Sequence, residues 1–288
     1  MKKRHIIVVA GPTASGKSDF AVDLALEYNG EIISADSRQI YRYLDIGTGK
    51  ISKKEMKGVP HHMIDVCDIN DSFSVAEYKK MALPIIEDIL TRGKTPIICG
   101  GTGQYIDALI FTSSFPRVPP NKKLREELEK KTTEALFNDL KKKDSRRAKV
   151  IDKYNRVRII RALEIIHAIG KVPSLKKESL QFDVTMYLLD PKKEILEKRI
   201  EKRLLKRLEN GMLTEMSSLL QKGYTQKKIA ERGIEYRYMS DYMDKKISYD
   251  ELVQKLKTQI WRYAKRQKTW NKKYLKKYPS IITLVTVE

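Results

Sequence analysis

Cysteine and histidine are scarce in this sequence. Its 288 residues include only two cysteines, Cys67 and Cys99, and four histidines, of which His61 and His62 are adjacent. Two isolated cysteines build neither a disulfide framework nor a CxxC zinc pair. Adjacent histidines on a strand point to opposite sides, so we expect structural roles for them and not a shared metal site. The cytoplasm is the simplest compartment for such a chain.

Long apolar segments and internal repeats are also missing. No apolar run approaches the roughly 20 residues that a membrane-spanning helix requires, so we expect no membrane partner. Hydrophobic residues make up 41% and charged residues 33% of the chain, which is typical of a globular protein with a charged surface. The length allows one large domain or two.

Negative charge is relatively scarce in one part of the chain. The formal net charge is +21, but residues 1–111 hold 14 basic and 14 acidic residues. Residues 112–288 therefore carry the whole excess, with 44 basic and 23 acidic residues. A neutral segment followed by a basic one indicates small-molecule chemistry in the first and a polyanion such as nucleic acid bound by the second. An ordinary lysine-rich surface is the alternative.

A complete phosphate-loop motif is present near the start. The pattern G-x-x-x-x-G-K-[ST] is matched by Gly11, Pro12, Thr13, Ala14, Ser15, Gly16, Lys17 and Ser18. The apolar run before it predicts a buried strand at 5–10, and the residues after it predict a helix. In this context backbone N–H groups and the helix N-terminus bind phosphate, Lys17 adds positive charge, and the Ser18 hydroxyl is a candidate Mg²⁺ ligand. The motif does not say which phosphate compound is bound.

Polar residues follow the ends of two further predicted strands, near this loop. A strand at 31–35 leads into Asp36, and a strand at 95–99 leads into a glycine turn that contains Thr102. Ligands of parallel sheets bind beyond the carboxyl ends of the strands. Asp36 is therefore a candidate proton acceptor, and the Thr102 hydroxyl is a candidate contact to the reacting centre. From position alone, Asp36 can equally cap the following turn, and glycine alone can explain the second turn.

The rest of the chain predicts a basic helical insertion and a return to the sheet. A linker at 115–120 precedes the insertion, and a strand at 182–189 follows it. The final helix interleaves cations with aromatic rings, which suits RNA binding but also a packed core with solvated lysines. Further strands are predicted at 61–66 and 280–287, and further helices at 74–92 and 248–277. The predicted divisions are a phosphate-loop core over 1–115, a helical insertion over 116–181 and a return to the core over 182–288.

Several motifs in this order resemble one family, the tRNA dimethylallyltransferases, also called tRNA isopentenyltransferases. The resemblance rests on Gly11–Ser18, Asp36–Tyr41, Leu44–Lys50, Pro60–Asp65, Phe73–Ala76, Gly100–Tyr105, Asn155–Ala162 and Ala264–Trp270. It implies an α/β fold, with a P-loop NTPase-like parallel sheet flanked by helices and a helical insertion that grips tRNA. The chain departs from the family pattern at Gln104, Glu235 and Asn271, where the family usually has Leu, Gly and Phe.

The resemblance also implies a reaction, in which a dimethylallyl group moves from dimethylallyl diphosphate to the exocyclic amine of the adenosine 3′ of the anticodon. The phosphate loop would hold the diphosphate, with Mg²⁺ near Ser18. Asp36 would accept the amine proton, Thr102 would orient the base or the diphosphate, and Arg203 would stabilise the departing diphosphate. The adenine would leave its stack to react. The implied tRNA contacts are Asp36, Ser37, Arg38, Gln39, Thr102, Arg125, Arg156 and Arg158, and we expect a monomer.

Three other functions compete with this interpretation. A phosphate-loop small-molecule kinase would bind a nucleoside triphosphate and would not need a basic half. A non-catalytic RNA-binding protein would bind RNA regardless of Lys17. An adenylate isopentenyltransferase would use free AMP, whereas the basic helical portion favours a macromolecular acceptor.

Overall fold

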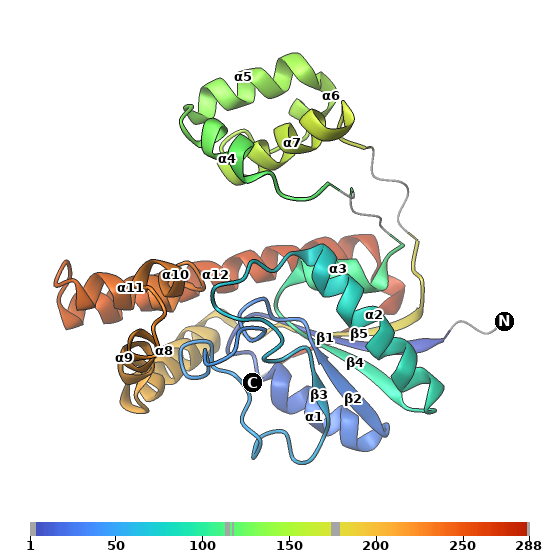
Figure 1. The fold of residues 1–288 in the computed structure, drawn as a ribbon. Coiled ribbons are helices and arrows are strands. Elements are labelled where there is room, and N and C mark those ends of the chain that lie inside the picture. Colours follow the sequence, from blue (N-terminus) through green and yellow to red (C-terminus); the bar gives the residue numbers. More distant parts are fainter. Residues whose placement is uncertain (1–3, 113–115, 117, 174–178, 287–288) are drawn as a thin grey trace. The chain divides into compact units, whose positions relative to one another are not determined.

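In the computed structural model the chain divides into two units, each with its own core (Figure 1). One unit comprises Met1–Thr112 with Leu180–Glu288, and the other is Ser113–Ser179. The structure describes residues 4–112, 116, 118–173 and 179–286. The predicted linker at 115–120 lies partly outside the described residues. The insertion boundaries inferred from the sequence, at 116 and 181, fall close to the limits of the second unit.

The first unit is built on a sheet whose strands are all parallel, in the order β3-β2-β4-β1-β5-β6. The strands are β1 (His5–Ala10), β2 (Gly30–Ser34), β3 (His61–His62), β4 (Thr95–Gly100), β5 (Asp183–Leu189) and β6 (Ile282–Val285). Strand β5 follows the insertion and pairs with β1 from His5↔Asp183 to Ala10↔Leu188. The α/β fold with a parallel sheet and a helical insertion is therefore confirmed.

Two of the predicted strands are shorter than expected. In the region 61–66 only β3 pairs with the sheet, because Met63 (φ 62°) and Asp65 (φ 57°) adopt left-handed backbone that cannot continue a strand. The predicted last strand is confirmed as the edge strand β6, although Val287 lies outside the described residues.

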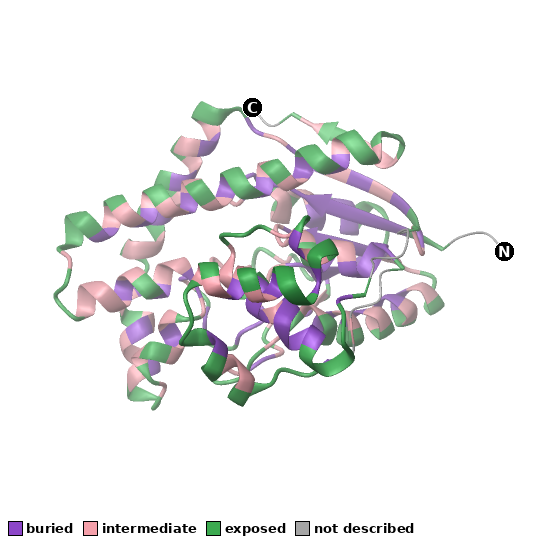
Figure 2. Ribbon diagram, turned by 90° about the horizontal axis from the view of Figure 1, so that it is seen from above, coloured by how far each residue is buried: buried purple, intermediate pink, exposed green. Residues whose placement is uncertain are grey.

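Helices cover both faces of the sheet, because successive strand residues point to opposite sides. Ile7 and Val9 pack on the α1 side, whereas Ile6 and Val8 belong to the larger cluster shared with α2, α3, α8 and α12. The buried sheet lies beneath helices that are buried along one side only (Figure 2). The helices are α1 (Lys17–Glu27), α2 (Val75–Thr91), α3 (Gly103–Ile110), α8 (Lys193–Glu209), α9 (Met212–Gln221), α10 (Gln226–Ala230), α11 (Ile234–Met243) and α12 (Tyr249–Lys277).

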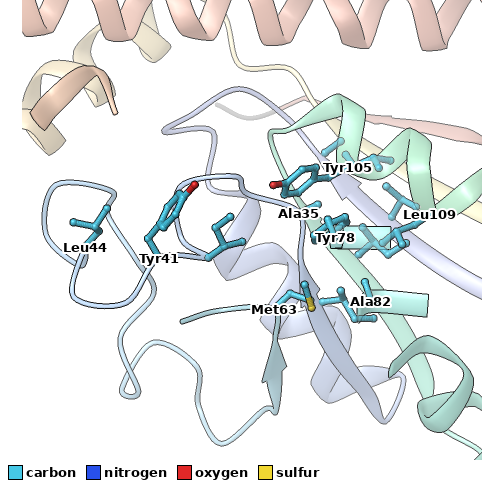
Figure 3. Packing of buried hydrophobic residues seen from close by; sticks show 14 of the residues in the cluster. Ala35, Tyr41, Leu44, Met63, Tyr78, Ala82, Tyr105 and Leu109 are labelled. Atoms are coloured by element: carbon cyan, nitrogen blue, oxygen red, sulfur yellow. The ribbon is translucent and has the colours of Figure 1, made fainter. Parts of the chain in front are cut away.

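Aromatic packing fixes the end of β2, where the site begins. Tyr78 of α2 and Tyr105 of α3 stack with ring centroids 3.9 Å apart. The Tyr78 hydroxyl donates to the carbonyl oxygen of Ser34 at 2.9 Å. Figure 3 shows both tyrosines beside Ala35, the residue that leads from β2 into the site.

The second unit is a helical bundle with a separate apolar core. Its buried residues include Leu136, Leu140, Ile159 and Leu163. Side-chain caps begin its helices, as when Asn155 Oδ1 accepts the N–H of Arg158. The helices are α4 (Lys122–Glu129), α5 (Thr133–Lys143), α6 (Ser145–Ala148) and α7 (Arg156–Ile169).

Across the described part of the chain, no helix combines the length and the apolar character needed to cross a membrane. The longest, α12, covers 29 residues but is rich in lysine and arginine.

A buried carboxylate ties the strand β2 to its neighbours. Glu31 is 3% exposed and accepts hydrogen bonds from Arg92, Lys94 (2.8 Å) and His62 (2.8 Å). The hydrogen bond from Arg92 is the main cause that holds the pKa of Glu31 well below its usual range, and it outweighs the effect of burial. His62 therefore has the structural role expected, and no cluster of metal ligands occurs among the residues described.

Replacement of Glu31 by glutamine should lower the free energy of unfolding by about 3 kcal/mol at pH 7, because it leaves cations without their buried partner. The depressed pKa gives the wild type stability that is present above the unfolded pKa, near 4.3, and lost as the pH falls below it. Thermal unfolding from pH 7 to pH 3 should therefore show a smaller acid loss in Glu31→Gln. Glu87→Gln, which removes an exposed partner of Arg4, should change the unfolding temperature little.

Candidate active site

The phosphate loop turns tightly between β1 and α1. Ala14 (φ 62°) and Gly16 (φ 88°) are left-handed, and α1 begins immediately afterwards at Lys17. A Cβ on Gly11 would lie 3.0 Å from the carbonyl oxygen of Leu189, so the close approach to β5 favours glycine there. The predicted sequence of strand, glycine loop and helix N-terminus is therefore present, and this is the arrangement that binds phosphate.

A narrow pocket of about 50 Å³ opens at this loop. Lys17 Nζ donates to the carbonyl oxygen of Pro12 at 3.3 Å. Burial lowers the pKa of Lys17, and the nearby Asp36 carboxylate opposes that effect. The pocket brings together polar residues that the sequence places far apart, among them Thr13, Lys17, Ser18, Asp36, Gln39 and Arg203.

Asp36 lies directly beyond the carboxyl end of β2, as predicted. Its Oδ1 accepts the backbone N–H of Arg38 at 2.9 Å. The carboxylate therefore both caps the following turn and lines the pocket, so the two interpretations of its position are compatible. The turn fixes where the carboxylate lies.

Thr102 holds this turn against the end of β4. Its Oγ1 accepts the N–H of Ser37 at 3.0 Å, and its own N–H donates to the carbonyl oxygen of Ala35 at 3.0 Å. A Cβ on Gly100 would lie 2.2 Å from that same carbonyl oxygen, so only glycine allows the two strand ends to come so close. Thr102 is also hydrogen-bonded to Tyr263 of α12, whose pKa is raised above its usual value, chiefly by burial.

Arg203 reaches the phosphate loop from α8, as the motif predicted. Its guanidinium donates to the carbonyl oxygen of Gly49 at 2.9 Å and to Thr13 Oγ1 at 3.4 Å. Burial, then the neighbouring Arg207, lowers the pKa of Arg203, and Asp36 raises it. Arginine remains charged despite such shifts, so a fixed cation lies beside the loop.

Glu215 of α9 is a positioning residue that the sequence did not indicate. Its carboxylate accepts the backbone N–H groups of Asp45 (2.8 Å), Ile46 (2.6 Å) and Gly47 (3.0 Å). The Tyr236 hydroxyl also donates to it, at 2.7 Å. These bonds fix the segment 44–50 and thereby the carbonyl that holds Arg203.

Gln267 of α12 is the second residue that was missed. Its Oε1 accepts the N–H of Thr13 at 2.8 Å, and its Nε2 donates to the carbonyl oxygen of Gly101 at 3.0 Å. The side chain is 7% exposed and joins the two glycine loops. Its place in the motif Ala264–Trp270 was the only signal for it. The alternative of core packing for the aromatic residues of α12 holds in part, because Trp261 is partly buried against the main cluster.

The three departures from the family pattern occupy different settings. Glu235 pairs with Arg207 at 3.3 Å, and both side chains are largely buried. Asn271 is 6% exposed, and its side-chain nitrogen has no hydrogen-bond partner among the described residues. Gln104 is exposed.

The three insertion arginines predicted to contact tRNA differ in their surroundings. Arg125 forms two hydrogen bonds with the buried Glu164, at 2.9 and 3.0 Å. Arg156 donates to the carbonyl oxygen of Glu129 at 2.6 Å, at the end of α4. Arg158 is exposed. Arg125 and Arg156 therefore stabilise the insertion, and their contact with tRNA stays a prediction.

The insertion should unfold more easily in the variant Glu164→Gln than in the wild type. The Glu164 carboxylate is 1% exposed and also accepts from Arg161 and the Asn121 N–H, so its loss should remove about 3 kcal/mol from the unfolding free energy of this unit. Arg125→Ala should cost about 1 kcal/mol, since the other donors remain. Hydrogen exchange of α4 and α7 in the whole protein measures both. Arg158→Ala is the control that should leave exchange unchanged, and equal exchange in all variants would contradict the expectation.

The residues at the loop fit a magnesium ion that is shared with a phosphate ligand. Mg²⁺ keeps several waters and takes few protein ligands, and the Ser18 hydroxyl lines the pocket beside Lys17. Among the described residues no group of three histidine, cysteine or acidic side chains forms a separate metal cage. Both cysteines are free and buried. The Ser15 hydroxyl is buried inside the loop and has no hydrogen-bond partner within the described chain.

Comparison with known proteins gives a consistent result. A family model described as IPP transferase matches residues 39–274. The tRNA dimethylallyltransferase of Caldanaerobacter subterraneus subsp. tengcongensis is 42% identical over 281 residues, which cover 94% of this chain and 89% of the relative. That of Pelotomaculum thermopropionicum is 40% identical over 280 residues, covering 95% and 89%.

Solved structures agree with the sequence relatives. The full-length tRNA isopentenylpyrophosphate transferase from Bacillus halodurans superposes with a TM-score of 0.72 at 36% identity, covering 99% of this chain and 90% of that one. A eukaryotic dimethylallyltransferase acting on tRNA gives a TM-score of 0.85 at 30% identity, covering 98% and 74%. Since the family model matches most of the chain and these sequence relatives are at least 40% identical over at least 94% of it, this chain belongs to the IPP transferase family.

Proposed function

We propose that this protein transfers a dimethylallyl group from dimethylallyl diphosphate to the exocyclic amine of the adenosine 3′ of the anticodon in tRNA. The observation that carries the proposal is that Asp36, the phosphate loop and Arg203 line one pocket. A carboxylate beside a phosphate-binding loop suits a reaction in which a nucleophile loses a proton while diphosphate departs.

The bonds follow from this arrangement. The adenine amine attacks the allylic carbon C1, a nitrogen–carbon bond forms, and the bond between C1 and the diphosphate oxygen breaks. The diphosphate leaves with the electron pair of that bond. Asp36 takes the proton that the amine gives up. The turn at Arg38 and the Thr102 contact to Ser37 hold this carboxylate in place.

Binding of the diphosphate relies on several groups of the loop. Lys17 exchanges the Pro12 carbonyl for a phosphate oxygen, and the buried Ser15 hydroxyl gains a partner. Arg203 contacts the same anion from the side of Thr13. A magnesium ion held by Ser18 and the diphosphate would supply further neutralisation of the leaving group.

The test combines the purified protein with unmodified anticodon stem-loop RNA, Mg²⁺ and radiolabelled dimethylallyl diphosphate. We expect label in the RNA, and no label when the adenosine beside the anticodon is replaced by uridine. Parallel reactions offer AMP as acceptor or labelled ATP as donor. Label in AMP but not in RNA would favour an adenylate isopentenyltransferase, and phosphate transfer from ATP would favour a kinase; either result would overturn the proposal.

A further inference from the structure

Two arginines lie next to each other on α8, beside the phosphate pocket. Arg203 and Arg207 are four residues apart, so they occupy the same face of the helix. Arg203 lines the pocket, and the Arg207 side chain is only 13% exposed. Like charges at this spacing repel each other, and the repulsion increases as water is excluded. A negative charge close to Arg207 would therefore stabilise this arrangement.

Both arginines bind the same short segment of the chain. Arg203 Nη2 donates to the carbonyl oxygen of Gly49 at 2.9 Å, and Arg207 Nη1 donates to that of Gly47 at 2.8 Å. Thr48, the residue between these glycines, lines the phosphate pocket. The position of Arg207 therefore affects the wall of the pocket, although Arg207 itself is not among the lining residues.

Glu235 provides the negative charge. It is the second residue of α11, and its Oε1 lies 3.3 Å from Nη2 of Arg207. The Glu235 side chain is 18% exposed, so water screens the pair only in part. The next residue, Tyr236, donates to Glu215, which in turn accepts the N–H of Gly47. One turn of α11 therefore supports the Gly47 peptide both through Arg207 and through Glu215.

Both charges of this pair act on Arg203. Burial is the main cause that lowers the pKa of Arg203, Arg207 lowers it further, and Glu235 raises it. The pair has a formal charge of zero, so Glu235 opposes the positive potential that Arg207 would otherwise add beside the pocket.

Glutamate at this position distinguishes the chain from the pattern of its family, which usually has glycine there. Glycine would provide no charge, so Arg207 would be a second uncompensated cation near a site for diphosphate. Such a cation would attract the diphosphate before its bond to carbon breaks and would retain it afterwards. Attraction that is equal in the ground state and the transition state does not raise kcat.

We propose that Glu235 is a positioning residue that limits how tightly the pocket binds diphosphate. It acts through Arg207, whose positive charge it compensates and whose guanidinium it keeps at the Gly47 carbonyl. Arg203 then remains the α8 cation that contacts the ligand. The inference rests on the proposed function, because it takes diphosphate as the leaving group.

The test is calorimetric titration of the whole protein with inorganic diphosphate in the presence of Mg²⁺. Glu235→Gln leaves Arg207 uncompensated and should bind diphosphate about threefold more tightly than the wild type. Arg207→Gln leaves Glu235 uncompensated and should bind it about threefold more weakly. The double variant removes both charges and should return to within about twofold of the wild type. A damaged pocket would bind more weakly in all three variants.

Two controls accompany this series. Glu209→Gln removes an exposed carboxylate from the end of α8, where water screens its charge, and should change the Kd by less than about twofold. Glu235→Asp keeps the charge and should bind diphosphate within about twofold of the wild type. Weaker or unchanged binding in Glu235→Gln would overturn the proposal. Equal tightening in Glu209→Gln would also overturn it, because it would report only the net charge of the protein.

The transfer reaction gives a separate measurement. In Glu235→Gln the inhibition constant of diphosphate for transfer to RNA should fall by the same factor, about threefold. If the wild type transfers no label to RNA, the proposed function fails. The titrations with inorganic diphosphate require no RNA and still decide whether Glu235 limits the affinity of the pocket.

Discussion

Asp36→Asn should reduce the rate of dimethylallyl transfer by about 10²- to 10⁴-fold, the usual contribution of a positioned general base. Asparagine retains a side-chain oxygen that can accept the Arg38 N–H, so the turn after β2 should survive. What it lacks is the carboxylate that takes the amine proton. RNA affinity should therefore stay within a few-fold of the wild type, while the single-turnover rate at saturating substrates falls.

Asp36→Ala separates positioning from proton transfer. Alanine removes both the carboxylate and the cap, so the turn that carries Ser37 and Arg38 should loosen and RNA affinity should fall modestly as well. Asp71→Asn, at an exposed position outside the pocket, serves as the control and should transfer at the wild-type rate. A wild-type rate in Asp36→Asn would rule out the base role and leave Asp36 as a turn residue only.

The sequence predicted the parts of this site that depend on short segments. The phosphate loop is a local motif, and the position of Asp36 follows from the rule that ligands lie beyond the carboxyl ends of parallel strands. Thr102 is predictable for the same reason, because its glycine turn ends the neighbouring strand β4. Each of these inferences needs only the order of the elements and the backbone freedom of glycine.

The residues that were missed act over long sequence separations. Gln267 contacts a loop 254 residues earlier in the chain, and Glu215 holds a segment about 170 residues away. Both contacts exist only because α9 and α12 pack where they do, and no local pattern encodes that placement. A buried glutamine or glutamate on a helix resembles any other polar residue in the sequence.

The count of basic residues does not show which of them are available to bind RNA. Arg125 belongs to the basic excess of the second half of the chain, but its guanidinium is bound to Glu164 inside the insertion. The shortened strand at 61–62 has a different cause. Met63 and Asp65 adopt left-handed backbone although neither is glycine, so the sequence did not predict that the strand ends there. In both cases tertiary contacts override the local signal.

Arg203→Ala should lower the transfer rate by about 10²- to 10³-fold, the range found when a group that stabilises charge in the transition state is removed. The leaving diphosphate gains negative charge as its bond to carbon breaks, and Arg203 lies beside Thr13 in the same pocket. The effect should fall on kcat more than on the KM for dimethylallyl diphosphate, because the attraction increases as the bond breaks.

Arg203→Lys tests whether geometry matters in addition to charge. Lysine keeps one positive charge but cannot contact the Gly49 carbonyl and an anion with a rigid planar group, so it should restore only part of the rate. Lys206→Ala, an exposed position on the same helix, is the control and should leave kcat unchanged.

A variant Arg203→Ala with normal kcat and a raised KM would contradict the role of Arg203 in stabilising the leaving group. It would mean that the guanidinium binds the diphosphate equally before and during bond breaking. The neighbouring Arg207 is paired with Glu235 at 3.3 Å and donates to the carbonyl oxygen of Gly47, so Arg203 and not Arg207 is the α8 arginine that contacts Thr13 of the loop.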